Sequence, residues 1–301
     1  MYHCTLLYGC LIESDQPLFA DLKSDDISET IPRYSLKLLE LQQDEQFENL
    51  EIATNFYNSH GRKLMFYSDR KFARSIKDQP WCFEVKNIVS FYWQSGQSTI
   101  YYKLENAGNT ELLTFWFTHI YLPAYLTLED RYDFLHAGAV EIDKKPVLFI
   151  APSTGGKSTM TDYFIKQGHG LISDDKVPTY IEDKQFIAVP SHPHHRPYRR
   201  FEDLGYRVDN MFSHTRPIHA IYSLVRNDND AIIINEINGF KRFETLLPNY
   251  LYSFRYLQAE RLKYLAKMLS SIPLYEIKRP WDMDKLDKVH AAIVQHSRQL
   301  T

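Results

Sequence analysis

The sequence has little cysteine and no long apolar run, and both absences exclude classes of protein. Its three cysteines, Cys4, Cys10 and Cys82, form no CxxC pair, which argues against a disulfide framework and a cysteine-rich metal site. No stretch approaches the roughly 18 consecutive apolar residues of a membrane span. The first residues also lack the basic region and apolar run of a secretory signal. These features predict a cytoplasmic protein.

An excess of charge of one sign is missing as well. The formal net charge is -3 over 301 residues, so sequence-independent binding to nucleic acid or to an acidic membrane surface is not expected. Hydrophobic residues make up 44% of the chain, which is enough to build a sizeable core in one large or two modest domains.

Short strand-like runs rich in aromatic residues dominate the first part of the chain. The expected strands are residues 2–12, 50–57, 63–68, 81–85, 88–93 and 98–104. The last three are expected to form an antiparallel meander. Few basic residues are interleaved with the rings, so we interpret the aromatic content as sheet packing rather than as a stacking platform for bases.

Residues 111–130 form a long apolar segment with helical spacing up to Leu122 and Pro123. We expect a buried helix here and place a domain boundary near Asp130, although no Gly/Ser/Pro-rich linker marks it. The predicted organisation is a β-rich N-terminal domain at residues 1–130 and a second domain at 131–301.

The most specific stretch is residues 147–159, VLFIAPSTGGKST. An apolar strand leads into a turn of small residues, and residues 160–167 carry a helical pattern that ends at Gly168. Such a loop points backbone N–H groups and the positive end of a helix at a polyphosphate. The residues expected around the phosphates are Ser153, Thr154, Gly155, Gly156, Lys157, Ser158 and Thr159. Ser158 is expected to reach a magnesium ion.

One position departs from the phosphate-loop pattern G-x-x-x-x-G-K-[ST]. Ala151 stands where the pattern has glycine, and we expect it to keep ordinary backbone dihedrals, because alanine tolerates positive φ poorly. The alternative interpretation is a surface turn before a helix, since Gly-Gly and Ser-Thr are common in turns and caps.

The strands around this loop predict the fold class. Residues 136–142 and 147–150 flank a tight turn at 143–146, which is too short for a parallel crossover and therefore indicates a hairpin. A second hairpin is expected from residues 177–181 and 186–189. We predict an α/β (α+β) fold, with a mixed, hairpin-rich sheet, a P-loop and flanking helices, preceded by the β-rich part.

An acidic pair, Asp174 and Asp175, follows an apolar run after the loop. Phosphoryl transfer needs one carboxylate near the magnesium ion and one that accepts the proton of the attacking hydroxyl. Adjacent residues on an extended chain point to opposite faces, so at most one faces the phosphates unless the backbone turns. The alternative is a solvated turn.

These motifs resemble the HPr serine kinase/phosphorylase carboxy-terminal domain and the HPr-kinase-related kinases, which share a nucleotide-binding core with phosphoenolpyruvate carboxykinases. The resemblance rests on His136-Ala137, residues 149–159 and residues 171–175, in matching order and spacing, and extends weakly to 8–22 and 273–277. The family usually has glycine where this chain has Thr154.

The resemblance implies ATP and Mg²⁺ as cofactors. It implies that Lys157 contacts the transferred phosphates and Ser158 the magnesium ion, that one of Asp174 and Asp175 is the base and its neighbour a metal-side carboxylate, and that His136 lies beside that aspartate. We take Asp175 as the metal-side carboxylate. Nothing matches the signature associated with phosphorylase activity, and the protein acceptor HPr is unsupported.

Residues 191–200, SHPHHRPYRR, admit three interpretations. The arginines can bind phosphate, with Arg199 and then Arg196 as the best candidates. The histidines can bind a metal, although they lack i,i+4 spacing. The segment can also be a solvated, proline-stiffened loop.

The rest of the chain is predicted to be structural. Strands are expected at 220–225, 231–235 and 274–277, a helical pattern at 239–268 is broken at Pro248, and an amphipathic packing helix covers 284–300.

We therefore predict a Mg-ATP-dependent kinase that phosphorylates a hydroxyl on an unidentified small molecule, peptide or protein. The alternative is a non-catalytic nucleotide-binding regulatory protein, for which the departures at Ala151 and Thr154 argue. Asp174 and Asp175 argue against it, because a pure binder needs no base. A homo-oligomer is left open.

Overall fold

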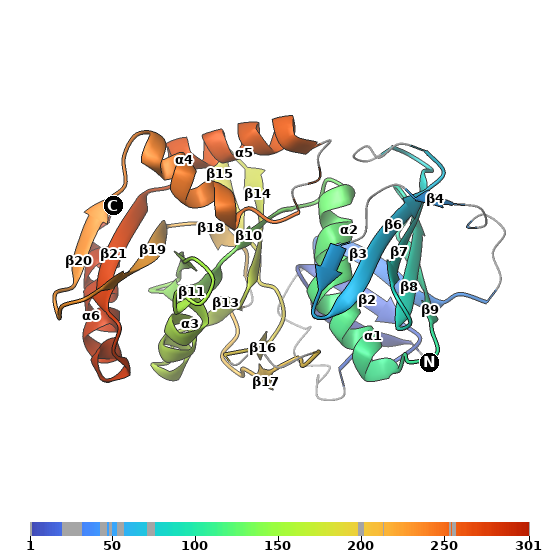
Figure 1. Ribbon diagram of the computed structural model, residues 1–301, viewed down its shortest axis with the longest axis horizontal. Helices are drawn as coiled ribbons and strands as arrows, with labels where there is room; N and C mark the ends of the chain where they lie inside the picture. The colour runs from blue at the N-terminus through green and yellow to red at the C-terminus, as the bar shows by residue number, and fades with distance from the viewer. Residues whose placement is uncertain are drawn as a thin grey trace. The chain divides into compact units, whose positions relative to one another are not determined.

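The computed structural model describes residues 2–19, 32–42, 47, 50–52, 57–70, 76–197, 202–212, 214–252, 254 and 257–300 (Figure 1). The chain divides into two compact units. The first comprises residues 1–131 and 200–204, and the second comprises 132–199 and 205–301.

A mixed sheet forms the first unit. Its strands are β1 (His3–Leu7), β2 (Cys10–Ser14), β3 (Tyr34–Glu40), β4 (Glu51–Ile52), β5 (Tyr57–Ser59), β6 (Arg62–Ser68), β7 (Pro80–Val85), β8 (Val89–Gln94) and β9 (Thr99–Leu104). They pair in the order β1-β2-β3-β9-β8-β7-β6-β4, with β5 also on β6. The predicted meander β7-β8-β9 is confirmed, whereas β3 runs parallel to both β2 and β9.

The strand predicted at residues 2–12 is wrong in one respect, because it is a hairpin. Tyr8 and Gly9 both have positive φ, which gives a two-residue turn between Leu7 and Cys10. Glycine at the second turn position makes this conformation accessible. Within the strand predicted at 50–57, residues 53–56 lie outside the described residues.

The apolar segment before the boundary is helical, as predicted. It consists of α1 (Thr110–Trp116), a π-helical turn η3 (Phe117–Tyr121) and α2 (Leu122–Leu128). The Asn109 side chain caps the start by accepting from the Leu112 N–H at 2.9 Å. The segment packs on the sheet through rings such as Tyr121, which stacks on Phe91 at a centroid distance of 4.3 Å.

The second unit contains mixed sheets and flanking helices, so the predicted fold class is confirmed. Its strands are β10 (Asp133–His136), β11 (Gly138–Ile142), β12 (Lys145–Ile150), β13 (Leu171–Ser173), β14 (Lys176–Glu182), β15 (Gln185–Ala188), β16 (His194–His195), β17 (Tyr206–Arg207), β18 (Arg216–Pro217), β19 (Ala220–Asn227), β20 (Ile233–Glu236) and β21 (Leu274–Pro280). Its helical elements are α3 (Lys157–Lys166), α4 (Phe240–Leu246), η4 (Leu247–Asn249), α5 (Gln258–Ser271), η6 (Met283–Lys285) and α6 (Leu286–Gln299).

The main sheet of the second unit has the order β13-β11-β12-β19-β21-β20, and apolar cores lie on both faces of its strand β12. On one face, Val147 and Phe149 of β12 pack with apolar residues of α3 and α6. On the other, Leu148 and Ile150 join a core that includes the β10-β14-β15-β18 sheet, α4 and α5. Alternate residues of one strand thus serve two cores, which explains its uninterrupted apolar sequence.

One detail of the predicted topology is corrected. The expected strand at 136–142 is split at Ala137, so that β10 pairs with β14 whereas β11 pairs with β12 and β13. Strand β21 lies between β19 and β20, parallel to β19 and antiparallel to β20. The β11-β12 and β14-β15 hairpins are confirmed.

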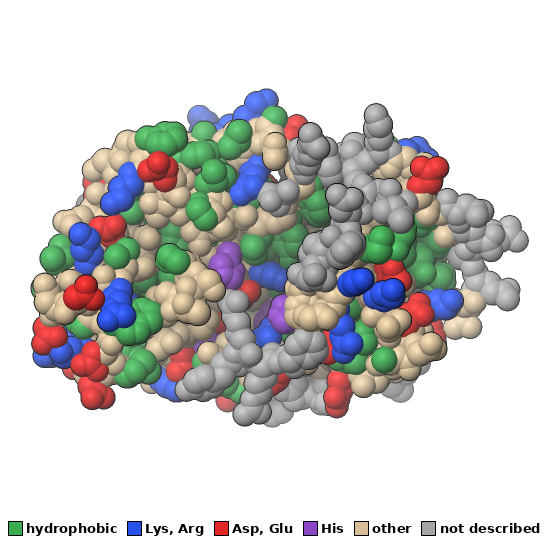
Figure 2. Space-filling model, viewed as in Figure 1, with side chains coloured by type: hydrophobic (Ala, Val, Ile, Leu, Met, Phe, Trp, Pro, Cys, Tyr) green, Lys and Arg blue, Asp and Glu red, His purple; other side chains and the backbone are tan. Residues whose placement is uncertain are grey.

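The surface of the second unit carries charges of both signs. Acidic and basic side chains are intermingled on the face shown in Figure 2. Among the helices of the described residues, none is both long and apolar enough to cross a membrane.

Candidate phosphate-binding site

Two residues of the loop between β12 and α3 have a left-handed backbone conformation. Thr154 has a φ of 62° and Gly156 a φ of 79°, whereas Ala151 is not among the residues with positive φ, as predicted. The Gly155 N–H donates to the Pro152 carbonyl at 2.9 Å and closes the loop. A β-branched residue in the left-handed region is strained, so Thr154 is the unusual residue of this loop.

Packing also requires the two glycines. A Cβ at Gly155 would lie 2.7 Å from the Ala151 Cβ, and one at Gly156 would lie 2.1 Å from the Arg279 Nη2. Gly156 precedes the first residue of α3, so the helix starts directly behind the loop with its N–H groups directed at the loop. The backbone N–H groups of the loop and of the first turn of α3 therefore point toward the same region in front of the loop.

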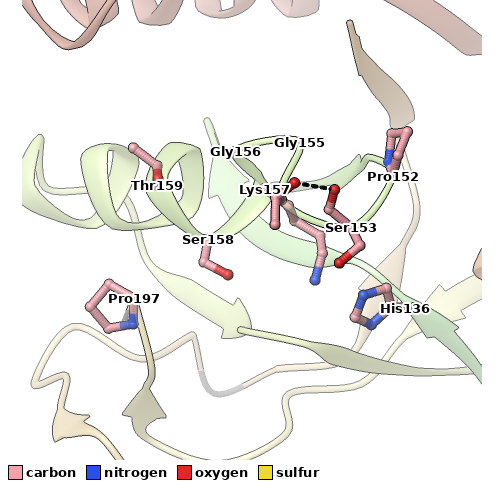
Figure 3. A pocket seen from close by; sticks show the side chains of 10 residues that line it. His136, Pro152, Ser153, Gly155, Gly156, Lys157, Ser158, Thr159 and Pro197 are labelled. Carbon is pink, nitrogen blue, oxygen red and sulfur yellow. Dashed lines mark hydrogen bonds between the residues drawn. The ribbon is translucent and has the colours of Figure 1, made fainter. Parts of the chain in front are cut away.

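An open cavity of about 230 Å³ lies in front of the loop. It is lined by His136, Pro152, Ser153, Thr154, Gly155, Gly156, Lys157, Ser158, Thr159 and Pro197. Figure 3 shows Lys157, Ser158 and His136 directed toward the same space, whereas Thr159 points away from it. Every loop residue predicted to surround the phosphates therefore lines one cavity.

Asp175 is the aspartate that contacts two residues lining this cavity. Its Oδ1 lies 2.9 Å from the Lys157 Nζ and 3.3 Å from the His136 Nδ1. The Lys157 side chain is almost fully buried, while the Asp175 side chain is 35% exposed. A buried ammonium needs a negative partner, and here it has a carboxylate that a phosphate can replace.

Asp174 points to the other side of the chain. Its buried carboxylate accepts from the His195 ring, with Nδ1 at 2.7 Å, and from the Arg196 backbone N–H at 2.8 Å. The His195 Nε2 lies 3.6 Å from Asp162 on α3, and Asp162 accepts from the Tyr206 hydroxyl at 2.6 Å. Only one of the two carboxylates, that of Asp175, contacts Lys157. The Asp174 carboxylate instead holds the 194–196 segment in place.

The interpretation of 191–200 as a solvated loop is wrong for residues 191–195. Ser191, His192, His194 and His195 are all buried. Burial lowers the pKa of His192 to about 3, and its Nδ1 accepts the His194 N–H at 3.3 Å. Arg196 reaches Asp174 through its backbone, and Arg199 lies outside the described residues.

Oxygen donors suitable for Mg²⁺ are present at the cavity. Mg²⁺ prefers one or two protein oxygens together with substrate phosphates, and the Ser158 hydroxyl and the Asp175 carboxylate match this preference. No cluster of three or more His, Cys, Asp or Glu residues that could hold a metal occurs in the described part of the chain.

Two residues that were not predicted, Arg279 and Trp281, lie beside the loop. The Arg279 Nη2 donates to the Gly155 carbonyl at 3.2 Å, and its guanidinium carbon lies 4.9 Å from the centre of the Trp281 ring. They follow the last predicted strand, but their sequence carries no motif. Only the parallel pairing of β12, β19 and β21 brings them to the loop.

Comparisons with known proteins add little. No protein-family model matches the chain, and no curated protein matches it. Among solved structures, it is similar to the Hpr(Ser) kinase/phosphatase from Coxiella burnetii, with 19% identity over 55% of this chain and 95% of that chain, and a TM-score of 0.34. This TM-score is too low to establish a family, so the function proposed below rests on the site.

Proposed function

We propose that the protein is a Mg-ATP-dependent phosphotransferase that acts on a hydroxyl of a small molecule, peptide or protein, in the cytoplasm. The observation that carries the proposal is the arrangement of Lys157 and Asp175, with Nζ and Oδ1 2.9 Å apart at a cavity lined by the loop and the start of α3. A binding loop needs the lysine, and transfer to a hydroxyl also needs a base.

The residues divide the chemistry as follows. Backbone N–H groups of the loop and the Lys157 ammonium bind the β- and γ-phosphates. Lys157 then leaves its ion pair with Asp175 and contacts a phosphate oxygen instead. Mg²⁺, held by Ser158 and the phosphates, supplies charge neutralisation when bound. The acceptor oxygen bonds to the γ-phosphorus, the bond from that phosphorus to the bridging oxygen breaks, and ADP leaves with the electron pair.

The sequence led us to expect a metal-side role for Asp175, but Asp174 is held by His195 and Arg196, so we assign the base role to Asp175, which takes the proton from the acceptor hydroxyl. Its Oδ1 is 3.3 Å from the His136 Nδ1, so His136 orients the carboxylate once Lys157 has moved to the phosphate. Asp174 is buried against His195 and Arg196, and we assign it a positioning role for the strand end that carries Asp175.

Calorimetric titration with Mg²⁺ and a non-hydrolysable ATP analogue tests the binding step. The native protein is expected to bind, and Lys157→Ala is expected to lose binding, because the loop then lacks its phosphate cation. Failure of the folded native protein to bind would contradict the proposal.

ATP consumption tests the transfer step and separates an enzyme from a non-catalytic nucleotide-binding protein. The strained Thr154 in the loop favours that second candidate. An enzyme consumes ATP, and Asp175→Asn abolishes consumption while analogue binding persists. Binding without consumption in any acceptor screen would favour the regulatory protein.

A further inference from the structure

A second cavity of about 110 Å³ lies on the other side of Gly156 from the phosphate cavity. It is lined by Gly156, Thr159, Arg279, Trp281, Asp282, Met283 and Leu286. Gly156 and Thr159 line both cavities, so the two adjoin at the first turn of α3. A ligand whose phosphates occupy the first cavity can extend into the second without crossing the core.

Large apolar side chains are exposed at this second cavity. Trp281 is 47% exposed and Met283 is 67% exposed. The other three tryptophans of the chain, Trp81, Trp93 and Trp116, are fully buried in the first unit. An exposed indole next to a cavity is a surface that a flat apolar ligand would cover.

Arg279 holds the Trp281 ring in place. The Arg279 residue is 4% exposed, and its guanidinium carbon lies 4.9 Å from the ring centre. Its described hydrogen bonds go to the Gly155 and Pro280 carbonyls, and its Nε has no hydrogen-bond partner among the described residues. Because Arg279 contacts the loop and stacks on the indole, it links the position of Trp281 to that of the phosphate loop.

We infer that this second cavity receives the base of the nucleoside triphosphate, stacked on Trp281 beside Met283. The inference rests on the proposed function and identifies the donor as a nucleotide rather than an inorganic polyphosphate. The Asp282 carboxylate at the cavity is an acceptor for an exocyclic amino group or a ribose hydroxyl. The phosphate loop can bind any polyphosphate, whereas an indole contributes affinity only when a base is present.

Affinities of Trp281→Ala for MgATP, MgGTP and magnesium tripolyphosphate test the inference. Loss of base stacking, worth about 1–3 kcal/mol, is expected to weaken binding of at least one nucleotide by about 5- to 150-fold. Tripolyphosphate affinity is expected to stay unchanged. The matched control is Phe240→Ala, which removes another exposed aromatic ring, 73% exposed on α4 and outside both cavities.

Tryptophan fluorescence gives a second measurement on the native protein. Acrylamide reaches Trp281 but not the three buried tryptophans, so quenching reports this residue. The favoured nucleotide is expected to protect Trp281 from acrylamide, while tripolyphosphate leaves quenching unchanged.

The outcomes separate this inference from the proposed function. Equal binding of nucleotide and tripolyphosphate, with no effect of Trp281→Ala and no protection, would overturn the base site and leave the phosphate site standing. If the native protein binds none of the three ligands, the proposed function fails and the base site fails with it.

Discussion

At the scale of single residues, the site depends on two neighbouring aspartates with different surroundings. Asp175 is partly exposed and lies 2.9 Å from Lys157, whereas Asp174 is buried and accepts two hydrogen bonds from residues 195 and 196. Both residues lie in the bend between β13 and β14, and there the two carboxylates have different partners.

Substituting each aspartate by asparagine should therefore have different effects. Asp175→Asn is expected to lower kcat by about 10²–10⁴-fold, because the base is lost, and also to lower the free energy of unfolding, because the buried Lys157 ammonium loses its negative partner. Asp174→Asn is expected to lower the free energy of unfolding by about 1–3 kcal/mol, because a charged acceptor of two buried donors is lost. Steady-state kinetics and urea unfolding of both variants measure these quantities.

A magnesium titration of Asp175→Asn distinguishes base from metal ligand. If Asp175 is the base, excess Mg²⁺ does not restore kcat. Restored activity at high Mg²⁺ would reassign Asp175 to the metal.

Thr154 gives a separate prediction, on stability. Its φ of 62° strains a β-branched residue by about 1–2 kcal/mol, and glycine would relieve this strain at an entropic cost of about 0.5–1 kcal/mol. Thr154→Gly is therefore expected to raise the free energy of unfolding by up to about 1 kcal/mol in urea titrations. The control Thr154→Val keeps the branched Cβ and should not raise the free energy of unfolding. A larger increase for Thr154→Val than for Thr154→Gly would contradict the strain argument.

At the scale of elements, a buried carboxylate ties a helix end to a strand turn in the first unit. Glu129, directly after α2, accepts from the Trp93 indole at 3.0 Å, the Ser95 hydroxyl at 2.8 Å and the Gly96 N–H at 2.9 Å. These donors lie at the end of β8 and in the turn that follows it. The helix and the meander are thus joined by one side chain.

Removing this acceptor should destabilise the protein strongly. Glu129→Ala leaves three donors without an acceptor and is expected to lower the free energy of unfolding by about 3 kcal/mol or more. Glu129→Gln keeps a carbonyl oxygen and should lose less. Urea unfolding monitored by tryptophan fluorescence suits the test, because Trp93 is itself one of the donors; equal losses for both variants would show that charge rather than hydrogen bonding dominates.

At the scale of the whole molecule, buried histidines in the second unit make stability depend on pH. Burial lowers the pKa of His192 to about 3, and burial also lowers the pKa values of His290 and His296. The unfolded chain, with histidine pKa values near about 6.5, binds more protons than the native chain below that pH. The contribution of His192 to the free energy of unfolding is thus fully present above about pH 6.5 and is lost as the pH falls toward about 3.

The free energy of unfolding should fall with pH in this window. His192 contributes at most about 1.4 kcal/mol per pH unit, and His192→Asn, which keeps an acceptor for the His194 N–H, should flatten the slope. Urea titrations between pH 4 and pH 8 measure it. An identical slope in the variant would mean that other groups set the acid sensitivity.

Much of the local structure could be predicted because it depends on short-range chemistry. The hairpin β11-β12 follows from a turn that is too short for a crossover, and α3 follows from a helical pattern directly after glycines. The break at Ala137 and the burial of His192, His194 and His195 could not be predicted. Both depend on partners distant in sequence, such as β14 for β10 and Asp174 for His195.

The local sequence was sufficient to predict the strand, the small-residue turn and the helix at 147–167, because neighbouring residues in the chain set these conformations. The contact of Asp175 rather than Asp174 with Lys157 depends on the tertiary fold, since β13 and β14 must be placed before the side chains between them can be oriented. The tertiary fold also decided that Arg279 reaches Gly155, 124 residues away in the chain. Parallel pairing through β19 creates that contact, and long-range pairing of this kind leaves no local pattern in a sequence.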